Sequence, residues 1–301
     1  MSLGRIAKLN TGANIPLLGL GTWQSKPDVV KHAVKFALQT GYRHIDAAWI
    51  YGNEKEVGEA IRESNIPREQ IFVTTKLWNN SHRPQDVLPA LETSLKNLGL
   101  DYVDLYLMHW PLAFKSGPEP VTKDADGKIV FENVDFTDTY KAMEDLLATG
   151  KTKAIGVSNF SIENLEKIID SCKVVPAANQ VELHPENPQW ELLDFCKSKG
   201  IHVTAYSPLG STESPLIKRE EITKIAQKHN SPNASVLIAW GQQRGTSVIP
   251  KSVNESRIAS NFKDIELDEE DLKVLKSLTE GKAAHRYCDP KEFWGIDLFK
   301  K

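Results

Sequence analysis

Four side chains that can hold or move a proton follow the ends of predicted strands. Asp46 and Lys76 end two consecutive strands, Tyr51 lies in the loop between them, and His109 ends the next strand. Neighbouring strands lie about 4.8 Å apart, so Asp46 and Lys76 can form an ion pair. A cation beside a phenol favours the phenolate, so we expect Lys76 to make Tyr51 a better proton donor. With His109 orienting a carbonyl, this set suits protonation of an oxygen on which negative charge develops.

Each of these residues alone also has an ordinary structural interpretation. A lysine at a strand end is more often solvated or salt-bridged than catalytic, and a histidine there is more often a hydrogen-bonded structural residue. A chemical alternative is an aldolase or isomerase in which Lys76 forms a Schiff base. Pairing with Asp46 would keep Lys76 protonated and poor at that task. Convergence of four such groups at one place favours proton transfer.

Tryptophan is unusually frequent after the predicted strands. Four of the seven tryptophans follow the first four strands. Barrel interiors prefer branched aliphatic side chains, so indoles at these positions are expected to line a pocket rather than to fill a core. These four residues are Trp23, Trp49, Trp78 and Trp110.

These residues need a scaffold that brings the ends of several strands together. Short apolar runs alternate with amphipathic segments along the chain, a pattern that predicts parallel strands separated by helices. Eight such units in 301 residues favour a (β/α)8 barrel, whereas five or six would favour a doubly wound sheet. The predicted strands are Leu17–Leu20, His44–Asp46, Phe72–Lys76, Val103–His109, Ala154–Val157, Ala178–Val181, His202–Tyr206 and Ser247–Ile249.

Several helices can be placed from their periodicity and caps. Apolar residues recur at helical spacing from Val87 to Leu98, although Pro89 predicts that this helix begins late or bends. Asn187 is expected to cap another helix that has Pro188 at its first position. Further helices are predicted over 138–149 and 234–244 and after Asp268.

The two ends of the chain have distinct patterns. Residues 6–9 and 14–16 predict a small hairpin at the bottom of the barrel. The tail, residues 281–301, shows neither helical nor strand periodicity but is rich in aromatic side chains. Such a tail is unlikely to be free in water, so we expect it to fold over the open end of the barrel. Its aromatic residues are Tyr287, Phe293, Trp294 and Phe299.

Composition excludes several classes of protein. Lys plus Arg number 37 against 40 Asp plus Glu, and this net charge of −3 disfavours a nucleic-acid-binding surface. The chain has no 18-residue apolar run, so no membrane span is expected. Three widely separated cysteines (Cys172, Cys196 and Cys288) argue against a disulfide framework or a metal site. We therefore expect one cytoplasmic domain over residues 1–301, a monomer, with a dimer as the alternative.

A phosphate-binding segment is predicted after the eighth strand. Lys251, Ser252 and Arg257 lie at the start of a predicted helix, where cations and backbone N–H groups can hold a phosphate. The same residues would also suit a solvated helix face. No G-x-G-x-x-G follows any predicted strand, so a Rossmann site is not supported.

Several segments, in order from about residue 14 to residue 261, resemble the aldo-keto reductases. Residues 41–58, GYRHIDAAWIYGNEKEVG, are similar to the first signature of that family, and residues 153–160, KAIGVSNF, to the second. Residues 249–261 resemble the third, and the tail is similar to those of yeast xylose reductases and glycerol dehydrogenases. As a whole, the chain resembles fungal aldose, xylose and glyceraldehyde reductases. The segments DLYLMHWP and NQVELHP, residues 104–111 and 179–185, fit as well.

This resemblance implies NADPH-dependent reduction of small aldehydes, open-chain aldoses or uronates by direct hydride transfer. Asp46, Tyr51, Lys76 and His109 match the catalytic tetrad, with Tyr51 as the general acid. A Lys, a hydroxyl and an Arg at the third signature favour NADPH over NADH, because NADH has no phosphate to pair with them. Because some barrels of this family have slow or lost chemistry, the alternative is a cofactor-binding regulatory or structural protein.

The resemblance also implies two sets of binding residues. Arg286 in the tail is a further candidate, since it could pair with a substrate carboxylate. The implied coenzyme-binding residues are Gly21, Thr22, Trp23, Asp46, Ser158, Asn159, Gln180, Tyr206, Ser207, Leu209, Ser211, Lys251, Ser252, Arg257 and Asn261. The implied substrate-binding residues are Trp23, Trp49, Trp78, His109, Trp110 and Trp294.

Overall fold

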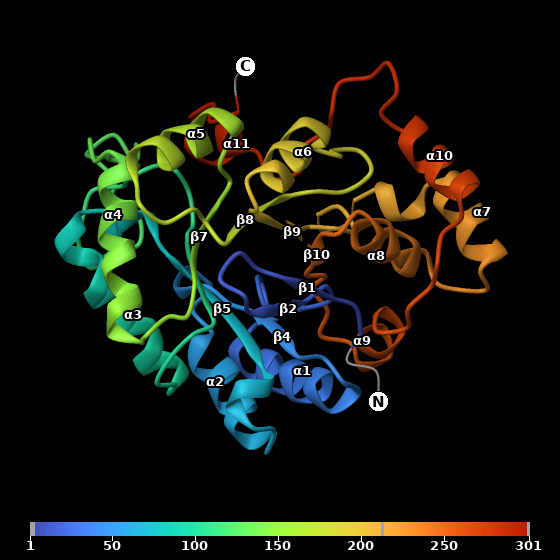
Figure 1. Cartoon of the computed structure of the whole chain (residues 1–301), viewed down its shortest axis with the longest axis horizontal. Helices are drawn as coiled ribbons and strands as arrows, with labels where there is room; N and C mark the ends of the chain where they lie inside the picture. Colours follow the sequence, from blue (N-terminus) through green and yellow to red (C-terminus); the bar gives the residue numbers. More distant parts are fainter. Residues whose placement is uncertain (1–3, 212–213, 300–301) are drawn as a thin grey trace.

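Eight parallel strands curl around a common axis, and helices cover their outer face (Figure 1). The structure is a computed structural model that describes residues 4–211 and 214–299. Each strand pairs with the next along the chain. The strands are β3 (Leu20–Gly21), β4 (His44–Asp46), β5 (Phe72–Leu77), β6 (Leu105–Met108), β7 (Ile155–Ser158), β8 (Ala178–Glu182), β9 (His202–Tyr206) and β10 (Ser247–Val248).

The first and last strands join to close the barrel. The N–H of Gly19 donates to the Val248 carbonyl at 2.9 Å, and the N–H of Val248 donates to the Leu17 carbonyl at 2.8 Å. An isolated parallel bridge pairs Leu18 with Val248. The predicted (β/α)8 barrel is confirmed, although regular pairing in the first strand begins only at Leu20.

The helices lie between the strands, largely where the periodicity predicts them. The helix that contains Pro89 begins before it, at Pro84, so the alternative of a late start is wrong. The principal helices are α1 (Pro27–Thr40), α2 (Glu54–Glu63), α3 (Pro84–Leu98), α4 (Phe136–Leu146), α5 (Ile162–Ser171), α6 (Trp190–Ser198), α7 (Glu220–Lys228), α8 (Asn233–Gln243), α9 (Glu255–Asn261), α10 (Glu269–Ser277) and α11 (Pro290–Trp294). Short 3₁₀ turns include η1 (Trp49–Tyr51), η3 (Asn79–Ser81) and η4 (Leu147–Thr149).

Two sequence-based assignments need correction. Asn187 does not cap α6, which begins at Trp190 with Gln189 as its N-cap. The Asn187 amide instead donates to the Glu182 carbonyl at 3.0 Å, so its hydrogen-bonding capacity is used in the turn after β8. The tail also contains a short helix, α11, which begins at Pro290 and is capped by Asp289. Five residues are too few for a periodic pattern to reveal it.

The hairpin closes the amino-terminal end of the barrel. Strands β1 (Ile6–Lys8) and β2 (Asn14–Pro16) pair in antiparallel fashion, as predicted. Ile15 is fully buried and belongs to an apolar cluster with inward-facing strand residues such as Phe72 and Leu107. This end of the barrel is therefore an apolar plug.

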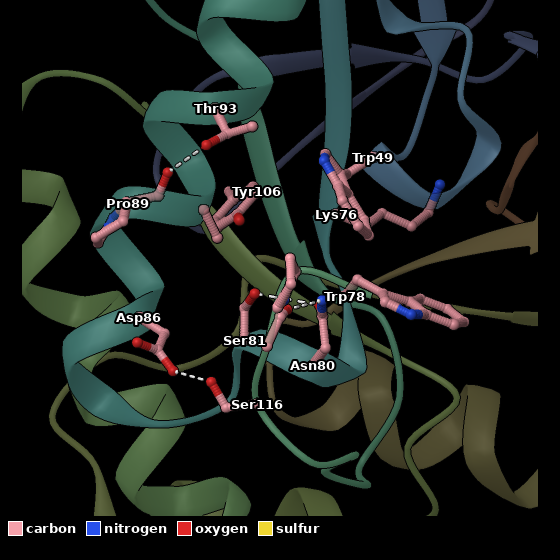
Figure 2. Close-up of a pocket in the computed structure, with 13 residues that line it drawn as sticks. Trp49, Lys76, Trp78, Asn80, Ser81, Asp86, Pro89, Thr93, Tyr106 and Ser116 are labelled. Atoms are coloured by element: carbon pink, nitrogen blue, oxygen red, sulfur yellow. Dashed lines mark hydrogen bonds between the residues drawn. The ribbon is translucent and has the colours of Figure 1, made fainter. Parts of the chain in front are cut away.

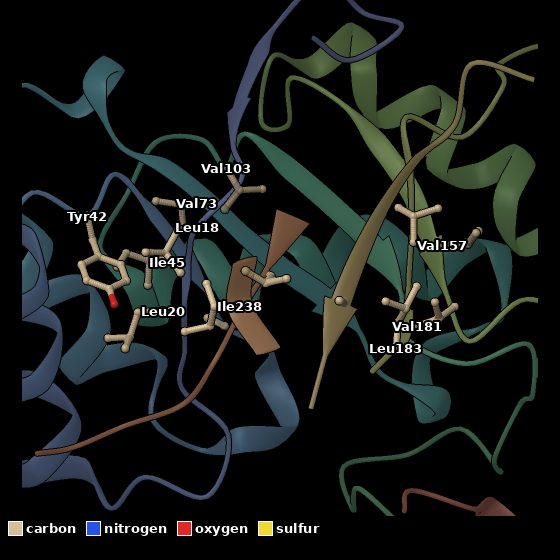
Figure 3. Close-up of a cluster of buried hydrophobic side chains, with 14 of the residues drawn as sticks. Leu18, Leu20, Tyr42, Ile45, Val73, Val103, Val157, Val181, Leu183 and Ile238 are labelled. Atoms are coloured by element: carbon tan, nitrogen blue, oxygen red, sulfur yellow. The ribbon is translucent and has the colours of Figure 1, made fainter. Parts of the chain in front are cut away.

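The outer faces of the strands pack against the helices in the main apolar core. Figure 3 shows strand residues such as Ile45 and Val73 near Tyr42, a fully buried side chain from the loop after α1. Helices α2 and α3 approach so closely that a Cβ on Gly58 would lie 1.8 Å from the Leu98 carbonyl oxygen. Among the described residues, no helix is long and apolar enough to cross a membrane.

Candidate active site

A buried lysine connects the ends of β4 and β5 to the η1 turn. The Lys76 ammonium donates to an Asp46 carboxylate oxygen at 2.7 Å, to the Ala47 carbonyl at 2.8 Å and to the Tyr51 hydroxyl at 3.4 Å. The side chains of Lys76 and Asp46 are 0% and 2% exposed. The predicted ion pair is thus present, and it is in contact with the phenol.

The expected effect of Lys76 on the phenol needs correction. Burial raises the pKa of Tyr51 well above 10, and the negative charge of Asp46 raises it further. Burial also lowers the pKa of Lys76, although Asp46 opposes that shift. Loss of water around the phenol therefore outweighs the nearby cation. Tyr51 stays protonated at neutral pH.

His109 presents a neutral imidazole to the same site. Its ring centroid lies 5.9 Å from that of Tyr51 and 5.1 Å from that of Trp78. Burial lowers the pKa of His109 well below 6.5, and the charge of Lys76 lowers it further. A neutral imidazole carries one N–H and can donate a hydrogen bond to a carbonyl oxygen.

Polar side chains from β7, β8 and β9 complete the base of the site. The Gln180 amide donates to the second Asp46 carboxylate oxygen at 2.7 Å, so Asp46 is held from two sides. The Asn159 amide donates to the His109 carbonyl at 3.0 Å and accepts from the Tyr206 hydroxyl at 2.8 Å. Sequence reasoning missed the contact between Gln180 and Asp46, because no local pattern connects residues so far apart in the chain.

These side chains surround a cavity of about 680 Å³ at the carboxyl ends of the strands. It brings together all of the predicted tetrad except Lys76, whose ammonium lies behind Tyr51 and Asp46. Two predicted coenzyme residues, Ser252 and Asn261, are largely buried and do not line it. The predicted coenzyme residues that do are Gly21, Thr22, Trp23, Asp46, Ser158, Asn159, Gln180, Tyr206, Ser207, Leu209, Ser211, Lys251 and Arg257.

Trp49 lies elsewhere than expected. It lines a smaller neighbouring cavity of about 360 Å³, which also contacts Lys76 and Tyr106 (Figure 2). Along the η1 turn, Ile50 and Tyr51 line the larger cavity, so their neighbour Trp49 points another way. Trp78 lines both cavities and separates them. The other predicted aromatic wall residues of the larger cavity are Trp23, Trp110 and Trp294.

Two cations line the far end of the larger cavity. Both Lys251 and Arg257 are exposed to solvent. Partial burial of the Lys251 ammonium and the charge of Arg257 lower the pKa of Lys251. Asn254 caps α9 by accepting from the Arg257 N–H at 3.0 Å. No acidic side chain pairs with Lys251 or Arg257 among the ion pairs of the described residues. This end of the cavity is therefore suited to an anionic group.

The tail is fixed over the mouth by a buried carboxylate. Glu182, at the end of β8, accepts from the N–H groups of Tyr287 at 2.7 Å and Cys288 at 2.8 Å. Its partner His184 lies 2.9 Å away. Trp294 of α11 packs on Trp110 with ring centroids 5.0 Å apart. The expected position of the tail is confirmed, but nothing in the sequence pointed to Glu182 as its anchor.

Two further tail residues lie near the mouth. Burial raises the pKa of Cys288 to about 12, and this thiol lines the larger cavity. The Arg286 guanidinium lies 3.6 Å from the Phe299 ring centroid. The three cysteines are free, and the described residues contain no group of three His, Cys, Asp or Glu side chains that could hold a metal ion.

Comparison with known proteins agrees with this fold and site. The model of the Aldo/keto reductase family matches residues 17–280. This match identifies the barrel, with its buried Asp–Lys pair behind Tyr51, as an oxidoreductase barrel. The chain belongs to the aldo-keto reductase family, whose members are NAD(P)H-dependent oxidoreductases that act on carbonyl groups.

Fungal enzymes are among the most similar relatives. The chain is 52% identical to the glycerol 2-dehydrogenase (NADP(+)) of Saccharomyces cerevisiae, with 98% of this chain and 97% of that one covered. It is 46% identical to the D/L-glyceraldehyde reductase of Hypocrea jecorina, over 99% and 95% of the two chains. A solved structure of the aldose reductase from Schistosoma japonicum is 40% identical and superposes with a TM-score of 0.92, over 98% of each chain.

Proposed function

We propose that this protein reduces small aldehydes and open-chain sugars to alcohols with NADPH, and that Tyr51 is the proton donor. The observation that carries the proposal is the contact between Lys76 and Tyr51 at the base of a cavity with aromatic walls. That cavity ends in Lys251 and Arg257, whose charges suit a phosphate. The names of the fungal relatives support the same substrate class.

The donor set fits a nicotinamide coenzyme. Asn159, which accepts from the Tyr206 hydroxyl, and Gln180 both line the cavity and would bind the carboxamide. The Tyr206 ring would stack on the nicotinamide. Lys251 and Arg257 would hold the 2′-phosphate. When bound, the coenzyme supplies a hydride to the carbonyl carbon.

The proton comes from the protein. As negative charge develops on the carbonyl oxygen, the Tyr51 hydroxyl donates its proton to that oxygen and the alcohol forms. The phenolate left behind is stabilised by the adjacent Lys76 ammonium, which Asp46 holds in place. The neutral His109 ring orients the carbonyl through a hydrogen bond.

The geometry disfavours the Schiff-base alternative. A nucleophilic amine needs a free lone pair, but Lys76 donates to three acceptors: Asp46, Ala47 and Tyr51. Its side chain is also 0% exposed and does not line the larger cavity, in which the carbonyl would bind. Treatment with borohydride and substrate should therefore leave the protein unlabelled.

Arg286 supports uronates as one class of substrate. Its positive charge acts on Tyr206 and Cys288, both of which line the larger cavity. A substrate carboxylate would therefore be attracted to this end of the site. We expect Arg286→Ala to reduce activity on galacturonate more than on glyceraldehyde, and equal losses would refute the assignment.

The decisive test is coenzyme oxidation, followed by the loss of absorbance at about 340 nm. Protein is mixed with NADPH or NADH and with glyceraldehyde, xylose or galacturonate. Loss of NADPH that depends on the aldehyde, and is slower with NADH, supports the proposal. NADPH binding without turnover of any carbonyl would favour a regulatory barrel instead. We further propose a monomer in the cytoplasm, which gel filtration and cell fractionation would check.

A further inference from the structure

Two carboxylates hold the tail, and each connects it to a different part of the molecule. The first is Glu182, at the end of β8, which is fully buried. Its oxygens accept from the N–H groups of Tyr287 and Cys288, and it also lies 2.9 Å from the His184 ring. This carboxylate fixes the backbone of the tail to the wall of the barrel.

The second carboxylate is Glu186, in the turn between β8 and α6. One oxygen accepts from the Tyr287 hydroxyl at 2.7 Å, and the other accepts from the Arg219 guanidinium at 2.7 Å. Its backbone carbonyl also accepts from the His285 N–H at 2.8 Å. Hydrogen bonds to an ionised carboxylate are roughly twice as strong as neutral ones. Glu186 therefore joins Tyr287 of the tail to Arg219, the N-cap of α7.

Arg219 is the last residue of the segment that connects β9 to α7. We call residues 207–211 and 214–219 the β9–α7 segment. Most of these residues line the larger cavity, which they share with Lys251 and Arg257. A coenzyme whose phosphate is held by these two cations would therefore lie against the β9–α7 segment.

The tail also contacts the β9–α7 segment directly. A Cβ on Gly210 would lie 3.3 Å from Cε2 of Tyr287, so the phenol ring packs against the Gly210 backbone. The Ser207 hydroxyl lies 3.8 Å from the Cys288 sulfur. Gly210, Ser207 and Cys288 all line the larger cavity, whereas Tyr287 does not. Tyr287 therefore supports the β9–α7 segment from behind, outside the space that a ligand would fill.

The same tail forms part of the aromatic wall of the cavity. Cys288, Phe293 and Trp294 line it, and Trp294 packs on Trp110. The positions of these side chains depend on the order of the backbone that carries them, and Tyr287 connects that backbone to the β9–α7 segment. Order in one wall of the cavity is thus linked to order in the other.

We propose that Tyr287 is a positioning residue that couples coenzyme binding to substrate binding, through its contacts with Glu186 and the β9–α7 segment. The inference rests on the proposed coenzyme. A coenzyme that orders the β9–α7 segment also fixes Gly210 and Arg219, and with them the surroundings of Tyr287. The tail is then already ordered, so it loses less conformational freedom when a substrate binds. Coupling of this kind is reciprocal, so substrate tightens coenzyme binding by the same factor.

The first test follows the tail by amide hydrogen exchange and needs no turnover. In the wild-type protein, NADPH should slow exchange in peptides of the β9–α7 segment and also, by about five-fold or more, in peptides that cover residues 285–295. Tyr287→Phe keeps the ring and the N–H bond to Glu182. In this variant NADPH should still protect the β9–α7 segment, but the tail should no longer respond.

Two partners of Arg219 provide a matched pair of variants. Glu186→Gln weakens the connection to Tyr287, so the tail should lose its response to NADPH. Glu221 also accepts from Arg219, at 3.3 Å, but makes no hydrogen bond to the tail among the described residues, so Glu221→Gln should behave as wild type. A wild-type tail that ignores NADPH while the β9–α7 segment is protected would overturn the proposal, and so would equal behaviour of the two variants.

The second test measures the coupling through turnover. With saturating NADPH, Tyr287→Phe should raise the KM for glyceraldehyde about ten-fold with kcat nearly unchanged, because one hydrogen bond to a charged group is lost. The Kd for NADPH alone, measured by fluorescence quenching, should stay nearly constant. An unchanged KM would contradict the role of Tyr287. If NADPH protected neither the β9–α7 segment nor the tail of the wild-type protein, the proposed coenzyme would be wrong and the coupling with it. Protection of both without turnover would count against the proposed reaction and still support the coupling of the two walls.

Discussion

The two ends of the barrel are built from the same strands but hold opposite chemistry. At the amino-terminal end, Leu9 and Ile15 of the hairpin segment pack on Phe72 and other apolar strand residues. At the carboxyl end, Asp46 and Lys76 form a buried ion pair beside Tyr51. The first end gains stability from apolar burial, whereas the second buries charge, which gives little net stability but fixes the reacting groups. The comparison teaches that stability and reactivity can be changed separately.

The largest effect should come from removing one hydroxyl at the carboxyl end. Tyr51→Phe deletes the proton donor, so aldehyde reduction should fall by about a hundred-fold or more. NADPH binding, measured by quenching of tryptophan fluorescence, should survive, and so should the midpoint of urea unfolding. Tyr102→Phe is the matched control, since Tyr102 lies outside both cavities against Arg68. If Tyr51→Phe kept its turnover, Tyr51 would not be the proton donor, and the carboxyl end would not have the chemistry assigned to it.

At the amino-terminal end, a substitution should lower the stability of the fold and leave activity unchanged. Ile15 is 0% exposed, so Ile15→Ala should lower the free energy of unfolding by about 2–5 kcal/mol. Ile6→Ala on the same hairpin should cost less than about 0.5 kcal/mol, because Ile6 is 55% exposed. Urea denaturation measures both. If Ile15→Ala changed the KM for aldehyde in the folded protein, the two ends would not be independent.

A smaller, selective effect is expected at the phosphate end of the mouth. Arg257→Ala removes one charged donor, so the Kd for NADPH should rise about ten-fold while that for NADH stays nearly constant. Fluorescence titration with both coenzymes gives the two constants. Lys263→Ala, an exposed residue just beyond α9, serves as the control. An equal rise in the Kd values for NADPH and NADH would show that Arg257 does not bind the 2′-phosphate.

The smallest expected effect is the response to pH. The pKa of His109 is lowered well below 6.5, and that of Tyr51 is raised well above 10. His109 therefore gains no proton, and Tyr51 loses none, between pH 6.5 and pH 10. Plots of kcat/KM against pH should be flat in this window once coenzyme saturation is ensured. A fall centred near pH 6.5 would mean that His109 becomes charged.

The sequence predicted the barrel and most of its mouth because strands buried on both faces are continuous apolar runs and functional residues follow their ends. Contacts between segments that lie far apart in the chain could not be predicted from the sequence. Glu182 anchors the tail, and Gln180 holds Asp46, through side chains that no local spacing connects. Trp49 was misplaced because a short 3₁₀ turn points adjacent side chains in different directions. The raised pKa of Tyr51 depends on burial, which a list of neighbouring charges does not contain.

Closure of the barrel also has a consequence for synthesis of the chain. Leu18 pairs with Val248, so the first strand has one of its two neighbours only when almost the whole barrel sequence exists. Until then, the edges of an open parallel sheet carry unpaired N–H and C=O groups. Pairing of strands that lie so far apart in the sequence is slow, because the chain loses conformational entropy before the stabilising contacts form. The nascent protein therefore spends most of its translation with exposed strand edges, and its final folding step waits for β10 to leave the ribosome.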